Sequence, residues 1–250
     1  LGYRDSRILS DSISWNDDNT INIDITLEEG RQYIFGDIVY VGNKSYTDQQ
    51  LNTLLKIEKG DVYNGAVLKE RISGDGSPNS EDIQTLYQNS GFLFSSVNAV
   101  ETKVVNDSIT VEVRIREDEK ATINKVSIVG NDKTNDFVIF RELRVKPGSL
   151  FSRDAIIRSI REIGQLGFFD TNVTPDVKPN YQDKTADIEF SVIEKGGSQI
   201  ELQGGYGGGS FIGTLGLSFN NFSVRNLFKK EAYKPLPMGD GQSLSLRLQT

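Results

Sequence analysis

The stretch IVGNDKTNDFVIFRELRVKPGSLFS, residues 128–152, decides the fold, because a second version of it occurs earlier in the chain. That version is VYVGNKSYTDQQLNTLLKIEKGDVYN, residues 39–64. Each begins with an alternating apolar segment, passes through V-G-N into a short helical pattern, and reaches a glycine that an aromatic residue soon follows. Such self-similarity indicates a duplicated structural unit.

Both copies continue in the same way beyond these stretches. The second continues as FSRDAIIRSIREIGQLGFF, in which Ser152 is a favourable N-cap and isoleucines recur at helical spacing. In the first copy, the Gly-, Ser- and Pro-containing segment 73–80 is expected to split or displace the corresponding helix. Two extended segments then close each copy, predicted as strands over 92–105 and 108–116, and over 168–178 and 185–193. Each repeat is therefore predicted to be strand–helix–helix–strand–strand.

This element order has a geometric consequence for the sheet of each repeat. The last two strands form a hairpin, and the first strand crosses over the helices to lie beside the final one. The penultimate strand is then an edge, whose unpaired backbone groups can accept an added strand. Pro175 and Pro179 are expected to weaken such pairing in the second repeat. The residues predicted on the two edges are Phe94, Val97, Ala99, Phe169 and Val173.

The chain changes character after residue 195. Nine of its 24 glycines lie between Gly196 and Gly216, and the helical periodicity ends there. The segments SQIELQGGY, FIGTLGLSF and QSLSLRLQ alternate between apolar and polar residues, as the strands of transmembrane barrels do. Alternation alone favours a soluble sheet, and the repeats that precede these segments reverse that preference. Gly196–Gly197 is interpreted as a hinge, and 207–209 as the turn between the first two strands.

Composition excludes several classes of function. The formal net charge is −7, which argues against a nucleic-acid partner, since phosphates require a basic surface. The chain has no cysteine and no histidine, so thiol chemistry, Ser–His triads and Cys- or His-ligated metals are ruled out. We expect no cofactor, no metal and no enzymatic activity. There is no signal peptide and no long apolar run, so the chain is either cytoplasmic or an internal piece of a longer protein.

The repeat and the glycine-rich segment together carry a resemblance. The signatures IVGNDKTNDFVIFRELRVKPGSLFS and IREIGQLGFFD, followed by the glycine-rich strand, are similar to the BamA family of outer-membrane protein insertases. The resemblance implies α+β POTRA domains (βααββ) in tandem, followed by the first antiparallel strands of a transmembrane β-barrel. The domains expected are the C-terminal hairpin of a truncated POTRA over 1–33, complete POTRAs over 34–120 and 121–195, and three barrel strands over 196–250.

The resemblance also implies a function. Members of this family receive unfolded outer-membrane proteins in the periplasm, bind accessory lipoproteins, and template strand insertion into outer-membrane lipid without ATP. Their first barrel strand lies at a lateral gate where substrate strands are thought to pair. The residues that match this strand are Gln199, Ile200, Glu201, Leu202, Gln203, Gly204, Gly205 and Tyr206.

Two further interpretations remain open at this point. Arg153, Arg158 and Arg161 of the second repeat are candidates for docking an accessory lipoprotein, on the basis of their expected exposure. The function itself has two alternatives: a related barrel that secretes or translocates a dedicated passenger, and a soluble POTRA scaffold. The partial third copy at the N-terminus counts against the secretion type, which usually carries two POTRAs.

Overall fold

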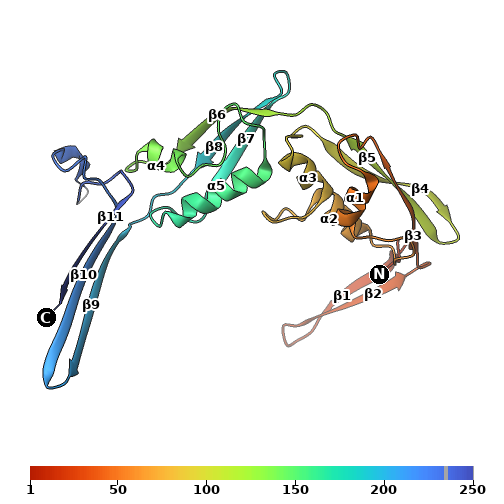
Figure 1. Ribbon diagram of the computed structural model, residues 1–250. Coiled ribbons are helices and arrows are strands. Elements are labelled where there is room, and N and C mark those ends of the chain that lie inside the picture. The colour runs from red at the N-terminus through yellow and green to blue at the C-terminus, as the bar shows by residue number, and fades with distance from the viewer. Residues whose placement is uncertain (234–235, 250) are drawn as a thin grey trace. The chain divides into compact units, whose positions relative to one another are not determined.

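The computed structural model describes residues 1–233 and 236–249 (Figure 1). The chain divides between Glu119 and Lys120 into two compact units, each described here by itself. Among the described residues, no helix is long and apolar enough to cross a membrane.

The first unit contains an N-terminal hairpin followed by one complete α+β repeat. The hairpin pairs β1 with β2 in antiparallel orientation. In the repeat, β3 is parallel to β5, β5 is antiparallel to β4, and the sheet order is β3-β5-β4. The elements are β1 Arg7–Trp15, β2 Ile21–Glu28, β3 Ile34–Val41, α1 Asp48–Leu55, α2 Gly65–Ser73, α3 Ile83–Asn89, β4 Ser96–Val105 and β5 Ser108–Arg116.

The second unit contains the second repeat and a separate antiparallel sheet. The repeat has the order β6-β8-β7, with β6 parallel to β8, and the second sheet has the order β11-β10-β9. The elements are β6 Thr122–Val129, α4 Asp136–Phe140, α5 Arg153–Gln165, β7 Thr174–Asn180, β8 Thr185–Ser191, β9 Ser198–Gly207, β10 Ser210–Phe222, the 3-10 turn η1 Lys230–Ala232, and β11 Gln242–Gln249. The predicted strand order and the predicted edge strands are confirmed in both repeats.

Each repeat buries one face of its sheet under its helices. The central strand β5 alternates strictly, and Ile109, Val111 and Val113 are fully buried. In β8, Ile188 and Phe190 have the same role. Full burial of each such side chain contributes roughly 1.5–3 kcal/mol. The alternation recognised in the sequence is therefore the pattern that builds the two cores.

At the V-G-N motif of each repeat, the chain leaves the first strand and turns toward the first helix. Gly42 and Gly130 have φ of +93° and +92°, and a Cβ on either would lie 2.0 Å from the carbonyl oxygen of Ile115 or Val192. The asparagine that follows closes the turn: the Asn131 amide donates to the Thr134 carbonyl oxygen (2.9 Å). Only glycine combines this backbone conformation with this close approach to the central strand.

A glutamate at the end of the central strand ties down the same loop in both repeats. Glu194 accepts hydrogen bonds from the amides of Thr134 (2.7 Å) and Lys133 (3.0 Å). Glu117 accepts from the amide (2.7 Å) and hydroxyl (2.8 Å) of Ser45 and from the Tyr87 hydroxyl (3.1 Å). Burial acts to raise the pKa of Glu117, but these hydrogen bonds outweigh it and hold that pKa below its ordinary value.

The first repeat differs from the second by an interrupted helix, as the sequence indicated. The segment after α2 leaves the helix at Gly74, which has φ +79°. The chain re-enters a helix at Asp82, a buried N-cap that accepts from the Thr85 amide (2.8 Å) and the Ser80 hydroxyl (2.7 Å). The predicted second helix is therefore split into α2 and α3.

Three of the residues predicted on the edge strands lie outside those strands. β4 begins at Ser96, so Phe94 precedes it, and β7 begins at Thr174, so Phe169 and Val173 precede it. All three side chains are buried, with exposed fractions of 6%, 0% and 7%. The predicted strands began too early because these apolar side chains fill the core before the regular ladder begins; Phe169 forms only an isolated bridge with Glu194. Val97 and Ala99 do lie in β4.

Candidate functional site

The sheet β9–β10–β11 has one apolar face and one polar face. Its cross-strand register places Leu202, Leu215 and Leu248 side by side. Ile200, Leu217 and Leu246 form the next row. The apolar side chains on the outer strands are exposed: Leu202 by 78%, Leu248 by 71% and Ile200 by 73%. An exposed apolar face of this size requires a covering partner or an apolar solvent.

The polar face of the same sheet is held together across its central strand. Glu201 on β9 and Arg247 on β11 both pair with Gly216 of β10, and their side chains form an ion pair at 3.3 Å. A Cβ on Gly216 would lie 3.2 Å from the Glu201 side chain, so the glycine leaves room for this bridge. The two faces therefore differ in chemistry, with Ile212, which pairs with Gly205 on the polar face, as an exception.

β9 pairs with β10 alone in the described sheet, so its other side is an edge. All ten of its residues are exposed. The strand turns into β10 through Gly208 and Gly209, with φ of +61° and +84°, as a two-residue primed turn requires. The turn predicted over 207–209 is thus shorter, because Gly207 still pairs with Ser210.

The geometry of this turn indicates which amides of β9 face the edge. In a hairpin with a two-residue turn the flanking residues form a hydrogen-bonded pair, and such pairs alternate along the ladder. The amides of Gln199, Glu201, Gln203, Gly205 and Gly207 are then directed to β10. Those of Ile200, Leu202, Gly204 and Tyr206 are directed to the open edge. All eight residues predicted at the strand-pairing site lie in this one strand.

A second candidate edge is β4, which borders a groove. A cavity of about 340 Å³ lies between α2 and β4, with Leu68, Ile72 and Val97 among its lining residues. At one end, Glu101 accepts a hydrogen bond from the Tyr63 hydroxyl (2.5 Å) and pairs with Arg4 (2.6 Å). Burial, followed by this contact with Glu101, raises the pKa of Tyr63 to about 12. The groove has an apolar floor and a charged end.

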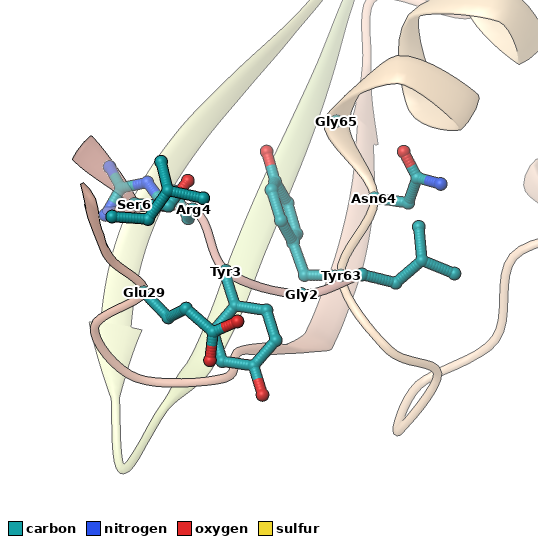
Figure 2. Close-up of a pocket in the computed structure, with 10 residues that line it drawn as sticks. Gly2, Tyr3, Arg4, Ser6, Glu29, Tyr63, Asn64 and Gly65 are labelled. Atoms are coloured by element: carbon teal, nitrogen blue, oxygen red, sulfur yellow. The ribbon is translucent and has the colours of Figure 1, made fainter. Parts of the chain in front are cut away.

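Next to this groove, the N-terminal segment docks on the first repeat. Figure 2 shows residues of this segment next to Tyr63 and Asn64, around a cavity of about 400 Å³. The carbonyl oxygen of Gly2 accepts from the Tyr33 amide (2.8 Å), and the Tyr33 hydroxyl donates to Asp5 (2.6 Å). The segment that leads into the β1–β2 hairpin is therefore anchored by backbone and side-chain contacts.

The three arginines predicted to bind a partner lie on α5. Arg158 and Arg161 are exposed and Arg153 is partly buried. Arg158 forms an i,i+4 ion pair with Asp154 at 2.8 Å. The structure brings them onto one helix, and no contact in the described chain assigns them a role.

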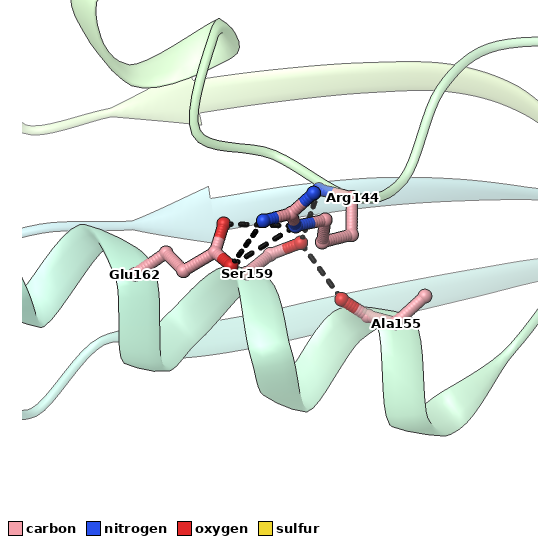
Figure 3. A network of polar contacts seen from close by, with 4 residues as sticks. All are labelled: Arg144, Ala155, Ser159 and Glu162. Atoms are coloured by element: carbon pink, nitrogen blue, oxygen red, sulfur yellow. Dashed lines mark hydrogen bonds and ion pairs between the residues drawn. The ribbon is translucent and has the colours of Figure 1, made fainter.

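A polar network that joins Arg144 to the same helix was not predicted from the sequence. Arg144 donates to Glu162 through Nε (2.9 Å) and Nη2 (2.8 Å), while its amide donates to the hydroxyl of Ser159 (2.8 Å) (Figure 3). Ser159 is fully buried and donates in turn to the Ala155 carbonyl oxygen (2.7 Å). The hydrogen bond to Glu162 raises the pKa of Arg144. The one sequence feature that could have indicated this network is Ser159, a serine among the apolar positions of the helix.

The described residues contain no group of three Asp or Glu side chains arranged to hold a metal ion.

The two repeats define a tandem array of α+β domains with a parallel outer strand, followed by an amphipathic antiparallel sheet. The POTRA family model, described as surface antigen variable number repeat, matches residues 33–118 and 121–195. The chain belongs to the POTRA family.

Curated proteins match most of this chain in sequence. A putative outer membrane protein assembly factor of Treponema pallidum is 24% identical over 236 residues, covering 92% of this chain and 27% of that protein. The outer membrane protein assembly factor BamA of Nitratidesulfovibrio vulgaris is 27% identical over 236 residues, covering 94% and 29%. The chain thus spans less than a third of the length of these relatives.

Solved structures give the same fold. The crystal structure of Haemophilus influenzae BamA POTRA3-5 has a TM-score of 0.61 at 21% identity, covering 77% of this chain and 74% of that one. BamA from Haemophilus ducreyi lacking POTRA domains 1–3 has a TM-score of 0.65 at 19% identity, covering 87% and 37%. Family and relatives together indicate an outer-membrane protein whose POTRA domains lie in the periplasm.

Proposed function

We propose that this chain is the periplasmic and strand-pairing part of an outer-membrane protein assembly factor. In this function it receives unfolded β-barrel proteins and templates their insertion, with accessory lipoproteins and outer-membrane lipid as partners. The observation that carries the proposal is the open, glycine-rich edge of β9, on an amphipathic sheet directly after two POTRA domains. The chain has no proposed catalytic residue, cofactor or metal.

The sheet β9–β10–β11 has the chemistry of a barrel wall. Ile200, Leu202 and Leu248 are exposed on one face, whereas the other face carries the Glu201–Arg247 ion pair. Transmembrane barrels place apolar side chains toward lipid and polar ones toward the lumen. In the proposal these are the first three strands of such a barrel, within the segment 196–250.

Strand pairing supplies the driving force in this proposal. An unfolded substrate in lipid has unsatisfied backbone groups, each of which costs several kcal/mol, so pairing with an open edge is favourable without ATP. Glycines at 204, 205 and 207 weaken β9 by roughly 0.5–1 kcal/mol each relative to alanine. A weak edge pairs reversibly, as a template for successive substrates requires.

The POTRA edges provide an earlier contact for the same substrates. β4 has an open edge beside an apolar groove, and we assign Val97 and Ala99 to extended-peptide binding there. β7 is a poorer acceptor because Pro175 and Pro179 lie within it. The first repeat is therefore the stronger binding site of the two.

The exposed hairpin β1–β2 fits the end of a preceding POTRA domain. Ile13, Trp15, Ile21 and Ile23 lie on one face of it and are exposed by 46–80%. The helices of its own domain are the natural cover for this face. A third POTRA favours assembly over the alternative of a two-partner secretion barrel.

Cysteine crosslinking tests the proposal directly. Single cysteines at positions 199–206 are expected to crosslink to the terminal strand of a stalled substrate with a two-residue periodicity, because alternate side chains share a face. Matched cysteines at 214–218 of β10, which is paired on both sides, serve as the control. Strong crosslinks from β10 and none from β9 would refute the proposal.

Charge reversal on α5 tests the accessory-partner surface. The double variant Arg158→Glu/Arg161→Glu is expected to weaken binding of an accessory lipoprotein several-fold, since exposed ion pairs contribute up to about 1 kcal/mol each. Co-purification from detergent extracts measures the effect, and Arg153→Glu extends the series. Lys125→Glu, an exposed change on β6, is the control. Unchanged recovery in both the double variant and Arg153→Glu would remove this surface from the proposal.

A further inference from the structure

The end of β10 and the connection that follows it return to the second repeat beside α4 (Figure 1). Polar contacts join them to residues at the start of α4, of which Thr134 is buried and Asn135 is exposed. The side-chain amide of Asn221 donates to the Thr134 hydroxyl (2.8 Å), and the side-chain amide of Asn135 donates to the Asp240 carboxylate (2.9 Å). Asp240 also accepts from the Ser223 hydroxyl (2.7 Å). Thr134, Asn221, Ser223 and Asp240 are each no more than 6% exposed.

Backbone bonds reinforce this contact. The backbone N–H of Asn135 donates to the Gly239 carbonyl oxygen (2.9 Å), and the backbone N–H of Gly239 donates to the Asn221 carbonyl oxygen (2.8 Å). Asn221 has φ +66°, and its side-chain oxygen accepts from the Gly241 nitrogen (2.9 Å). A non-glycine residue holds this conformation only where its surroundings fix it.

Glycines allow the root of the sheet to approach the domain closely. A Cβ on Gly241 would lie 2.7 Å from Val138 Cγ1, and one on Gly239 would lie 2.8 Å from the Lys133 carbonyl oxygen. A Cβ on Gly197 would likewise lie 2.9 Å from the Asn220 Cβ, whereas one on Gly196 would meet no atom within 4 Å. Gly197 is therefore a site of close packing, and the hinge expected at Gly196–Gly197 stays a prediction.

Comparison of the two repeats shows that this contact is specific to the second. At the equivalent position of the first repeat, Thr47 caps α1 in a reciprocal capping box with Gln50. Asn135 makes no side-chain cap hydrogen bond to its own helix. The second repeat has replaced a local cap, worth about 1 kcal/mol, by a bond to a residue 105 positions away.

We infer that Thr134, Asn135, Asn221, Ser223 and Asp240 form a latch that fixes the last POTRA domain to the root of the β9–β10–β11 sheet. With the latch closed, the domain and the sheet root move as one body. Opening it exposes several buried polar groups at once, each of which loses a partner in a partly apolar site. The inference concerns the joint alone and does not depend on the proposed function.

Hydrogen exchange in the intact protein tests the latch. In the wild type, the amides of Asn135, Gly239 and Gly241 are expected to exchange slowly. In Asp240→Ala they are expected to exchange roughly tenfold faster or more, because the buried Ser223 hydroxyl loses its acceptor at a cost of about 1–3 kcal/mol. In Asn135→Ala they are expected to exchange several-fold faster, because Asn135 is exposed and one hydrogen bond contributes about 0.5–1.5 kcal/mol net. The amides of β8 report that the domain itself stays folded. Thr47→Ala, the matched cap variant, is expected to leave residues 220–241 unchanged.

A distance measurement provides the second readout. These 250 residues contain no cysteine, so spin labels can be placed at Gln165→Cys on α5 and Ser245→Cys on β11. A narrow distance distribution is expected with the latch intact, and a broad one in Asn135→Ala. Fast exchange in the wild type, or a broad wild-type distribution, would overturn the inference. An Asn135→Ala protein identical to the wild type in both measurements would also overturn it.

Discussion

Replacing Gly130 with alanine is expected to destabilise the last POTRA domain by roughly 3–5 kcal/mol, a large fraction of the stability of a small domain. The new methyl group would lie 2.0 Å from the Val192 carbonyl oxygen, and that oxygen belongs to backbone that follows the central strand. Relief requires moving the first strand away from β8, which disrupts the sheet. The positive φ of +92° adds strain for any residue with a Cβ.

The chain offers a matched control for this change. Gly148 has a similar φ of +83° and is also exposed, but a Cβ there would meet no atom within 4 Å. Gly148→Ala should therefore report the cost of the backbone conformation alone, about 1–2 kcal/mol. The free energy of unfolding of both variants is measured in urea, with hydrogen exchange of the β8 amides as the readout. Equal losses in the two would show that the close approach to Val192 is unimportant.

Prolines on the open edge of β9 are expected to slow strand templating by about tenfold or more. In Leu202→Pro/Gly204→Pro, two amides directed to the edge are removed while the hydrogen-bonded pairs with β10 remain. Each lost hydrogen bond is worth roughly 0.5–1.5 kcal/mol, so pairing with a substrate strand should weaken by about tenfold or more. The measurement is the rate at which purified protein in liposomes folds an added barrel substrate.

Two variants make this result specific. Leu202→Ala/Gly204→Ala changes the same side chains but keeps both amides, and is expected to retain most of the activity. Gln203→Pro removes an amide directed to β10 and is expected to disturb the hairpin itself. Full activity in the double proline variant would contradict the assignment of β9 as the pairing edge, whatever the POTRA domains bind.

The fold was predictable because its main determinants are local and repeated. Strict alternation in β5 and β8, and a glycine placed where the chain turns, specify a strand order that needs no knowledge of distant contacts. The repeat then doubles each signal. The strand starts were harder to predict, because Phe94 and Phe169 look like strand residues and instead fill the core.

The candidate site was predictable only in part. The residues of β9 could be located because the apolar–polar alternation and the glycines that mark it lie within a single continuous segment. The contact of Asn135 with Asp240 could not, because it joins residues 105 positions apart and each looks like an ordinary turn residue. The Arg144–Glu162 ion pair was missed for a different reason, since a charged residue on a helix such as Glu162 normally suggests only a solvated face.

The different treatment of Thr47 and Asn135 shows how duplicated domains can diverge safely. A helix cap lies at the surface, so its side chain can turn to a new neighbour while the core keeps its packing. The first repeat has a self-sufficient cap, and the second has instead a contact with another part of the chain at the equivalent position. Tandem copies can thus become position-specific through single boundary residues, and a domain exchanged between the two positions would fold but would lack its junction.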